Sequence, residues 1–131
     1  FLLGSNLITV GTPLELIVVA EEVNNLFSAP MYIRYDSQLL EFVSATELNL
    51  MKRSGKTVFT TANMPEKGLI LVGLKLAEKD AGVSGGGGLF KLVFNPLAAG
   101  TTEIKPENFN FHNPQGVIIP VMGTGLKVEI Q

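Results

Sequence analysis

Short runs of β-favouring residues, separated by turn-forming residues, constrain the fold of this chain most strongly. Residues 14–20, 39–44, 56–62, 69–77 and 89–94 are rich in Val, Ile, Leu, Phe or Thr, and these side chains suit a pleated backbone. Glycine, proline and asparagine lie between the runs, and no long helical pattern is present. The pattern predicts an all-β sandwich of at least eight strands. Further short strands are expected at 6–10, 29–35, 100–104, 109–112, 117–121 and 126–131.

The segment 29–35 shows the alternation of a half-buried strand. Apolar or aromatic residues stand at every second position, and Tyr32 and Arg34 lie between them on the other face. A turn that begins at Asp36 then leads into 39–44. We therefore expect 29–35 and 39–44 to form a hairpin.

Two further segments carry specific expectations. Residues 69–77 are the longest apolar stretch, with apolar side chains on both faces, so we expect a central strand covered on both sides or part of an interface. The run from Gly85 to Gly88 is followed by the strand pattern of 89–94 and by no G-K-[ST], which argues against a phosphate loop. We interpret the glycines as a flexible or bulged approach to an edge strand.

Size and charge limit the function classes. The chain has 131 residues, 46% of them hydrophobic, which suits one domain spanning residues 1–131. Only 17% of the residues are charged and the net charge is −2, so the basic surface of a nucleic-acid-binding protein is missing. The absence of cysteine excludes disulfides and thiolate chemistry. Because the first residue is Phe1 and not Met, we expect a module excised from a longer protein.

Few side chains are suited to catalysis or to binding a metal. His112 is the single histidine, so a site with several imidazole ligands is excluded. No serine lies in a G-x-S-x-G context. Asp36 and Asp80 are too far apart for a calcium loop, and the adjacent Glu21 and Glu22 are expected to be solvated. We interpret His112 as an outward-facing strand residue next to a turn, and we predict no catalytic residues, no metal site, no cofactor and no enzymatic activity.

Four segments carry a family resemblance when they are taken together, in this order and at this spacing. They are VGTPL at 10–14, YDSQLLEF at 35–42, GLFKLVF at 88–94 and GTTEI at 100–104. Through them nearly the whole chain resembles the cohesin domain, which implies a nine-stranded jelly-roll sandwich, similar in fold to carbohydrate-binding modules. In this fold Asp36 accepts backbone N–H bonds in a turn. The inter-sheet core is then filled by Leu40, Phe42, Leu92 and Phe94.

The resemblance implies protein recognition without catalysis. Cohesin domains are receptors for dockerin modules in cellulosome scaffolds, and similar modules occur in secretin-type envelope proteins of bacteria. We therefore expect an adhesion or assembly module of a bacterial envelope or secreted protein, related to type II secretion or secretins and located outside the cytoplasm. Its expected partner is another protein module, dockerin-like or an envelope component. Dockerin-binding members usually present polar side chains at the start of the third strand, whereas this chain has Ser28, Ala29 and Pro30 there. Because Pro30 donates no hydrogen bond, we do not expect a standard cohesin–dockerin contact.

Tyr32 and Arg34 are the candidate binding residues, because tyrosine and arginine are enriched at interface hot spots. The competing interpretation is that Tyr32 packs on a neighbouring surface residue and that Arg34 is merely solvated. Polysaccharide binding is the alternative function, although a chain with no Trp and two Tyr has few rings to stack on sugars. Self-association through an edge strand, such as the one approached by the glycine run, is a further alternative.

Overall fold

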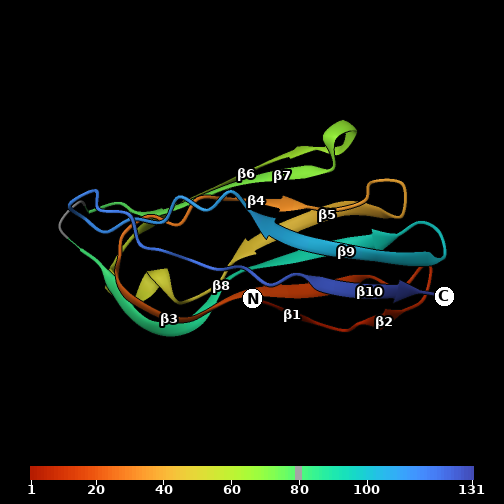
Figure 1. Ribbon diagram of the computed structural model, residues 1–131, viewed down its shortest axis with the longest axis horizontal. Coiled ribbons are helices and arrows are strands. Elements are labelled where there is room, and N and C mark those ends of the chain that lie inside the picture. Colours follow the sequence, from red (N-terminus) through yellow and green to blue (C-terminus); the bar gives the residue numbers. More distant parts are fainter. Residues whose placement is uncertain (79–80) are drawn as a thin grey trace.

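Two β-sheets stack face to face in the computed structural model, which describes residues 1–78 and 81–131 (Figure 1). The four-stranded sheet has the order β1-β3-β8-β5, with the bounds Leu2–Gly4, Leu14–Leu26, Val83–Pro96 and Leu40–Glu47. The six-stranded sheet has the order β2-β10-β9-β4-β7-β6, with the bounds Leu7–Ile8, Leu126–Ile130, Gly100–Glu107, Met31–Arg34, Leu69–Leu76 and Thr57–Met64. Two short 3₁₀ helices are η1 (Met51–Ser54) and η2 (Pro65–Lys67). The expected all-β sandwich is confirmed. Over the described ranges, no helix is long and apolar enough to cross a membrane.

Side-chain alternation along the strands builds the core between the two sheets. Leu40, Leu92 and Phe94 are each 0% exposed, as the sequence predicted. Phe42 is half-buried, and its ring centroid lies 5.9 Å from that of Phe94. Tyr35 reaches the same cluster, with its ring centroid 5.2 Å from that of Phe94. The aromatic cluster therefore connects the end of β4 to the opposite sheet.

The segments predicted as a hairpin around Asp36 lie in different sheets. β4 belongs to the six-stranded sheet and β5 to the four-stranded sheet, so the hairpin prediction is wrong. The Asp36 side chain accepts a hydrogen bond from the N–H of Gln38 at 2.9 Å, and its carbonyl accepts one from the N–H of Leu40 at 2.9 Å. The turn prediction is confirmed, and the turn carries the chain across the sandwich. The two strands do not pair because each buries its inner face in the shared core, so these faces lie opposite each other across the sandwich.

The glycine run is part of β8, which lies inside the four-stranded sheet between β3 and β5. The prediction that it approaches an edge strand is therefore wrong, while the predicted bulging is confirmed. The register of β3 against β8 shifts three times, and Ala20 and Val23 pair with Gly87 and Gly85. At Gly86 the two backbones approach so closely that a Cβ atom would overlap the carbonyl oxygen of Glu21. Glycine here permits close strand contact.

The segments 109–112 and 117–121 were predicted to be strands and are not. Within them the structure has only isolated bridges, of His112 with Ser28 and with Ile118. Phe111 is 3% exposed, and its ring meets that of Phe109 edge to face. The apolar side chains of this segment close one side of the core, and this packing explains the strand-like sequence without a ladder. His112 lies in isolated bridges and in no strand, so its predicted strand position is wrong. Its side chain is half-buried beside Phe27, and the turn predicted next to it, at Asn113, is confirmed.

β7 alternates between a buried and a half-buried face. Ile70, Val72 and Leu74 are at most 4% exposed, while Leu69 and Leu71 on the other face are half-buried. The prediction that this strand is covered on both sides is wrong, because its outer face lies on the surface of the six-stranded sheet. Its alternative, a strand at an interface, stays a prediction.

Candidate functional site

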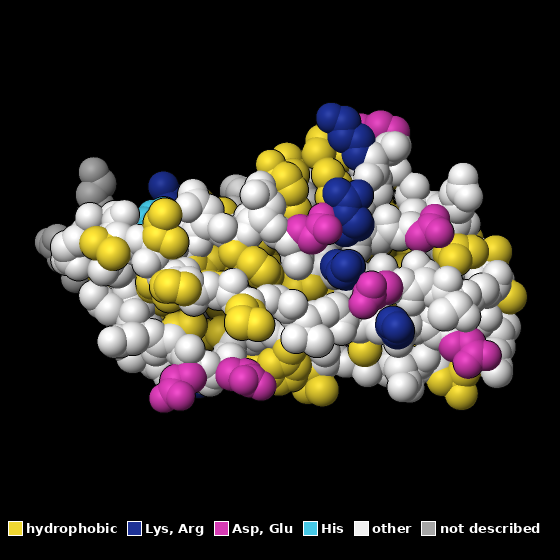
Figure 2. Space-filling view, in the orientation of Figure 1, with side chains coloured by type: hydrophobic (Ala, Val, Ile, Leu, Met, Phe, Trp, Pro, Cys, Tyr) yellow, Lys and Arg dark blue, Asp and Glu magenta, His cyan; other side chains and the backbone are white. Residues whose placement is uncertain are grey.

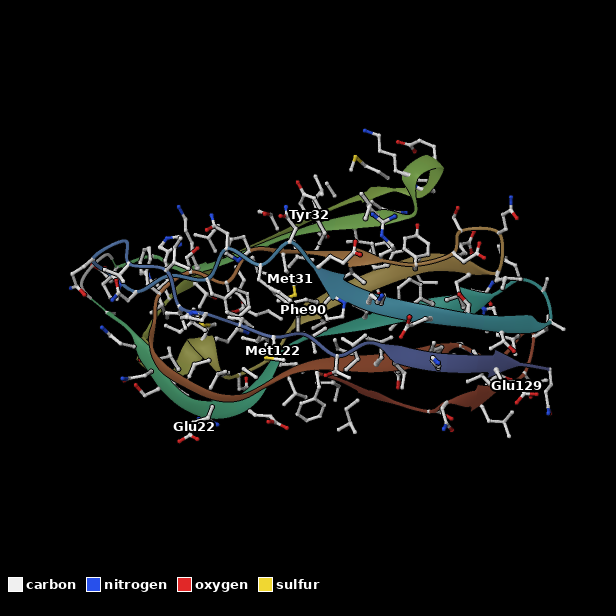
Figure 3. All side chains as sticks on the ribbon, in the orientation of Figure 1. Glu22, Met31, Tyr32, Phe90, Met122 and Glu129 are labelled. Atoms are coloured by element: carbon white, nitrogen blue, oxygen red, sulfur yellow. The ribbon has the colours of Figure 1, made fainter. Side chains whose placement is uncertain are left out.

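The candidate site is the outer face of the six-stranded sheet, meaning the face turned away from the core. β4 lies near the middle of this sheet, between β9 and β7. Since Met31 and Ile33 point into the core, Tyr32 and Arg34, which alternate with them, point outward. The two candidate binding residues therefore lie two positions apart on the same outward surface of β4, where Figure 3 shows Tyr32.

Arg34 is held in place by an ion pair with the neighbouring strand. Its Nε donates a hydrogen bond to Oε1 of Glu107 at 2.7 Å, and the two side chains are 50% and 35% exposed. Glu107 is also the cross-strand partner of Tyr32 in β9. Such an exposed pair contributes about 0–1 kcal/mol to stability. Arg34 is thus positioned by Glu107 and is not simply solvated.

The part of the β6–β7 outer face next to Tyr32 and Arg34 is apolar. Tyr32 pairs with Leu71, which pairs in turn with Ala62 of β6. Two residues further along β4, Arg34 pairs with Leu69, and Leu69 pairs with Met64 of β6. Tyr32 is half-buried between Leu71 and Glu107, which fits the competing interpretation that it packs on a neighbouring surface residue. A packed ring is also pre-ordered for contact with a partner.

A shallow pocket lies beside this apolar area. Its volume is about 240 Å³, and its walls include Pro30, Val58, Thr60, Gly73 and Lys75. Gly73 has no side chain, and the hydroxyl of Thr60 lies 2.8 Å from where its Cβ would be. The pocket therefore depends on a glycine on the outer face of β7. Pro30, which marks the departure from dockerin-binding members, lines it and is half-buried.

The β9–β10 side of the outer face is charged. Lys105 pairs across the strands with Arg34, and Lys127 of β10 pairs with Glu103. Figure 2 shows Lys and Arg side chains following one another across this face, with acidic side chains beside them. The face thus combines a charged half with an apolar half, and β4 runs between the two.

Sequence reasoning missed Glu107, Leu71 and the other neighbours of β4 on the outer face. Leu69 and Leu71 lie two positions apart, so the sequence places them on the same face of the expected strand 69–77. The sequence did not show that this is the outer face, because the residues on the other face are apolar as well. No local signal identifies Glu107, since it meets Arg34 only through pairing of strands 73 positions apart in sequence.

Side chains able to bind a metal do not cluster in the part of the chain that the structure describes. Among the residues that it describes, no three His, Asp or Glu side chains come close enough to share a metal ion. Nδ1 of His112 lies 3.2 Å from the carbonyl oxygen of Asn110. Asp80, used in the sequence argument against a calcium loop, lies outside the described residues.

The second tyrosine belongs to the core and not to the outer face. Tyr35 is 4% exposed, and its hydroxyl donates a hydrogen bond to Oδ1 of Asn63 at 2.6 Å. Burial raises the pKa of Tyr35 above its ordinary value, the bond to Asn63 opposes this, and the charge of Glu66 adds to it. Tyr32 is therefore the one tyrosine available to a partner on the outer face.

The fold is similar to known cohesin structures. The family model described as the cohesin domain matches residues 2–124. A cohesin module from a Clostridium perfringens family 33 glycoside hydrolase is 14% identical, with a TM-score of 0.84 and coverage of 99% of this chain and 93% of that one. A non-cellulosomal cohesin from Archaeoglobus fulgidus is 17% identical, with a TM-score of 0.78 and coverage of 99% and 89%.

A cohesin solved in a type I cohesin–dockerin complex from Clostridium thermocellum is 20% identical, with a TM-score of 0.80 and coverage of 99% and 97%. At these identities the structural matches show the fold alone. No curated protein matches the chain.

Proposed function

The chain belongs to the cohesin family, and we propose that it is a non-catalytic module that binds another protein through the outer face of its six-stranded sheet. The observation that carries this proposal is the position of Tyr32 and Arg34 at the boundary between an apolar and a charged half of that face. Interfaces commonly combine an apolar centre, aromatic and arginine anchors and a polar rim.

The proposed partner is a folded protein module with an apolar patch and an acidic group. Leu69, Leu71 and the ring of Tyr32 would cover the patch. Arg34 would offer its free guanidinium N–H groups to the acid, since only its Nε is bonded to Glu107 in the structure. A dockerin-like module or an envelope component fits this description, and cohesins of similar fold have been solved in complex with dockerin modules.

The contact proposed here differs from a dockerin contact that relies on polar groups at the start of β4. Ala29 is 0% exposed and its N–H donates to the carbonyl of Leu74 at 2.7 Å, so it offers nothing to a partner. Pro30 has no N–H. We therefore place the polar recognition further along β4, at Arg34, and the apolar recognition at Tyr32 and the pocket beside Gly73.

The proposed setting is the envelope or the secreted fraction of a bacterium, with a secretin-type or type II secretion assembly as the expected context. The resemblance of the sequence to secretin-associated modules supports this proposal, and the non-cellulosomal cohesin from Archaeoglobus fulgidus supports only the point that a similar module occurs outside cellulosomes.

The proposal is tested by capture with the immobilised chain. Envelope and secreted fractions of the source organism, together with a panel of purified dockerin modules, are passed over the wild type and over the Tyr32→Ala/Arg34→Ala variant. The matched control is Glu15→Ala/Lys91→Ala, which removes an exposed ion pair of 3.5 Å on the other sheet. We expect a specific protein that the control retains and the double variant loses.

Capture that the double variant retains would refute this binding face. Polysaccharide binding, the alternative predicted from sequence, is tested in parallel by retention on insoluble cellulose, chitin or bacterial polysaccharide. Retention on one of these without any captured protein would replace the proposed function by the alternative. The packing of the phenylalanines argues against this outcome, because four of them pack partly buried against the core: Phe27, Phe42, Phe59 and Phe109.

A further inference from the structure

β6 is an outermost strand of the six-stranded sheet, and no described segment forms a backbone ladder with its other side. The N–H of Ala77 donates to the carbonyl of Lys56 at 2.8 Å, so residues of even number in β6 direct their backbone groups to β7. The odd-numbered residues, from Thr57 to Asn63, direct theirs away from the sheet. Figure 1 shows no segment beyond β6 on that side, where the β6–β7 hairpin forms one margin of the molecule.

β6 also lacks the features that normally protect an edge strand. Thr57–Met64 contains no charged residue and no proline, and it pairs with β7 without a register shift over all eight residues. Natural edges are usually short, bulged or charged. The other edges follow that rule, since β1 and β2 have 3 and 2 residues, and β5 carries Glu41, Glu47 and a register shift.

From this geometry we propose that β6 pairs with β6 of a second copy of this chain, antiparallel and across a two-fold axis at Thr60. In that register Thr57 lies opposite Asn63 of the second copy, and Phe59 lies opposite its Thr61. All four residues are odd-numbered, so every outward N–H and C=O meets a partner in a hydrogen-bonded pair. A register shifted by one residue would place outward groups opposite inward ones and is excluded.

A second copy fits this edge because the edge is complementary to itself. On the outer face Thr60 meets Thr60 of the second copy and Val58 meets its Ala62, so no like charges are opposed. The ladder between the two copies would end at Pro65, because this residue has no N–H to donate at the next position that faces the second copy. Lys56 would lie opposite the uncharged Met64, so no like charges meet there either. Joining the two edges would make one continuous sheet and would set the two outer faces side by side.

The experiment measures the mass of the 131-residue chain in solution by sedimentation, across concentrations up to about 1 mM. We expect the wild type to move from 14.1 kDa toward twice that mass as concentration rises. Thr60→Lys and Thr60→Glu each place like charges on the two-fold axis, and each is expected to weaken self-association by about tenfold or more. An equal mixture of the two variants is expected to restore it, because opposite charges then meet.

Two controls separate this pairing from general surface effects and from misfolding. Thr101→Lys adds the same charge on the outer face of β9 and is expected to leave self-association unchanged. Thr61→Pro removes an outward N–H without touching the bonds to β7, so we expect it to abolish pairing while Thr61→Ala preserves it. The circular dichroism spectrum of each variant reports whether the fold is intact.

A wild type that stays at 14.1 kDa over the whole concentration range would overturn the proposal. So would a wild-type dimer that both charge variants leave intact, or a mixture of the variants that fails to restore the dimer. The inference does not depend on the proposed docking face, because mass is measured without any partner protein.

Discussion

Gly86→Ala tests the idea that the glycine run exists to let two backbones approach. A Cβ at this position would overlap the carbonyl oxygen of Glu21, and it would also lie 2.9 Å from the carbonyl carbon of Glu21 and 3.0 Å from the carbonyl oxygen of Ala20. These are backbone atoms, which cannot rotate away as a side chain can. The variant must therefore push β3 and β8 apart where Ala20 pairs with Gly87.

The expected cost follows from three contributions. Overpacking of this kind costs about 1–3 kcal/mol, and the rigid backbone here favours the upper end. A weakened ladder hydrogen bond adds about 1 kcal/mol. Against these, replacing glycine by alanine restricts the unfolded chain and stabilises the protein by about 0.4–1 kcal/mol. We expect a net loss of about 3 kcal/mol in the free energy of unfolding.

Gly88→Ala is the matched control, two positions along the same run. Its Cβ would meet the Cδ1 atom of Leu48 at 2.7 Å and Cγ2 of Ile17 at 3.4 Å. Both are side-chain atoms, and a shift of the Leu48 rotamer costs about 0.5–1.5 kcal/mol. The stabilisation that alanine gives by restricting the unfolded chain offsets most of this cost, so the free energy of unfolding should change by less than about 1 kcal/mol.

Urea unfolding followed by far-ultraviolet circular dichroism measures both variants under identical conditions. The reasoning is refuted if Gly86→Ala costs no more than Gly88→Ala. Equal and large losses for both would mean that the whole run is needed for backbone flexibility. Equal and negligible losses would mean that β3 and β8 are less closely packed than the structure has them.

Three further predictions concern the core and the outer face. Phe94→Ala removes a ring that is 0% exposed and contacts the rings of Tyr35 and Phe42, so we expect a loss of about 3–5 kcal/mol by the same unfolding assay, against less than about 1 kcal/mol for the exposed Phe1→Ala. The raised pKa of Tyr35 means that its neutral form is favoured in the folded state. The stability that this preference contributes is fully present below the unfolded-state pKa of about 10 and is lost as pH rises through the folded-state pKa. Tyr35→Phe should therefore flatten the alkaline part of a plot of unfolding free energy against pH. Arg34→Ala should lower stability by less than about 1 kcal/mol, because its ion pair with Glu107 is exposed; a larger loss in thermal unfolding would show that Arg34 is a structural residue and weaken its assignment to binding.

The candidate site could be predicted from sequence only in part. The alternation around Tyr32 and Arg34 is local, and a strand with one buried face must expose the other, so these two residues were found without a structure. Their neighbours could not be found, because strand order is set by which strands pair. Nothing near Arg34 in the sequence identifies Glu107 or Leu69 as its neighbours.

Two wrong predictions show the same limit in the fold. The chain between β4 and β5 has every local feature of a hairpin, yet it crosses between sheets, because both strands bury their inner faces in one core. The segment 109–112 has strand-like alternation, yet it closes the side of the core as an irregular segment. In both cases the local pattern reports which side chains are buried and does not report which backbone is the hydrogen-bonding partner.

The sequence by itself determined the all-β class, the turn at Asp36, the buried positions of Leu40, Leu92 and Phe94, and the outward direction of Tyr32 and Arg34. These follow from side-chain alternation and turn chemistry, which act over a few residues. Only the tertiary structure decided which strands are neighbours, where the glycine run lies, and that β6 is left as a free edge. Those features depend on hydrogen bonds between segments distant in sequence, which form in a particular register only when all the apolar faces are buried together.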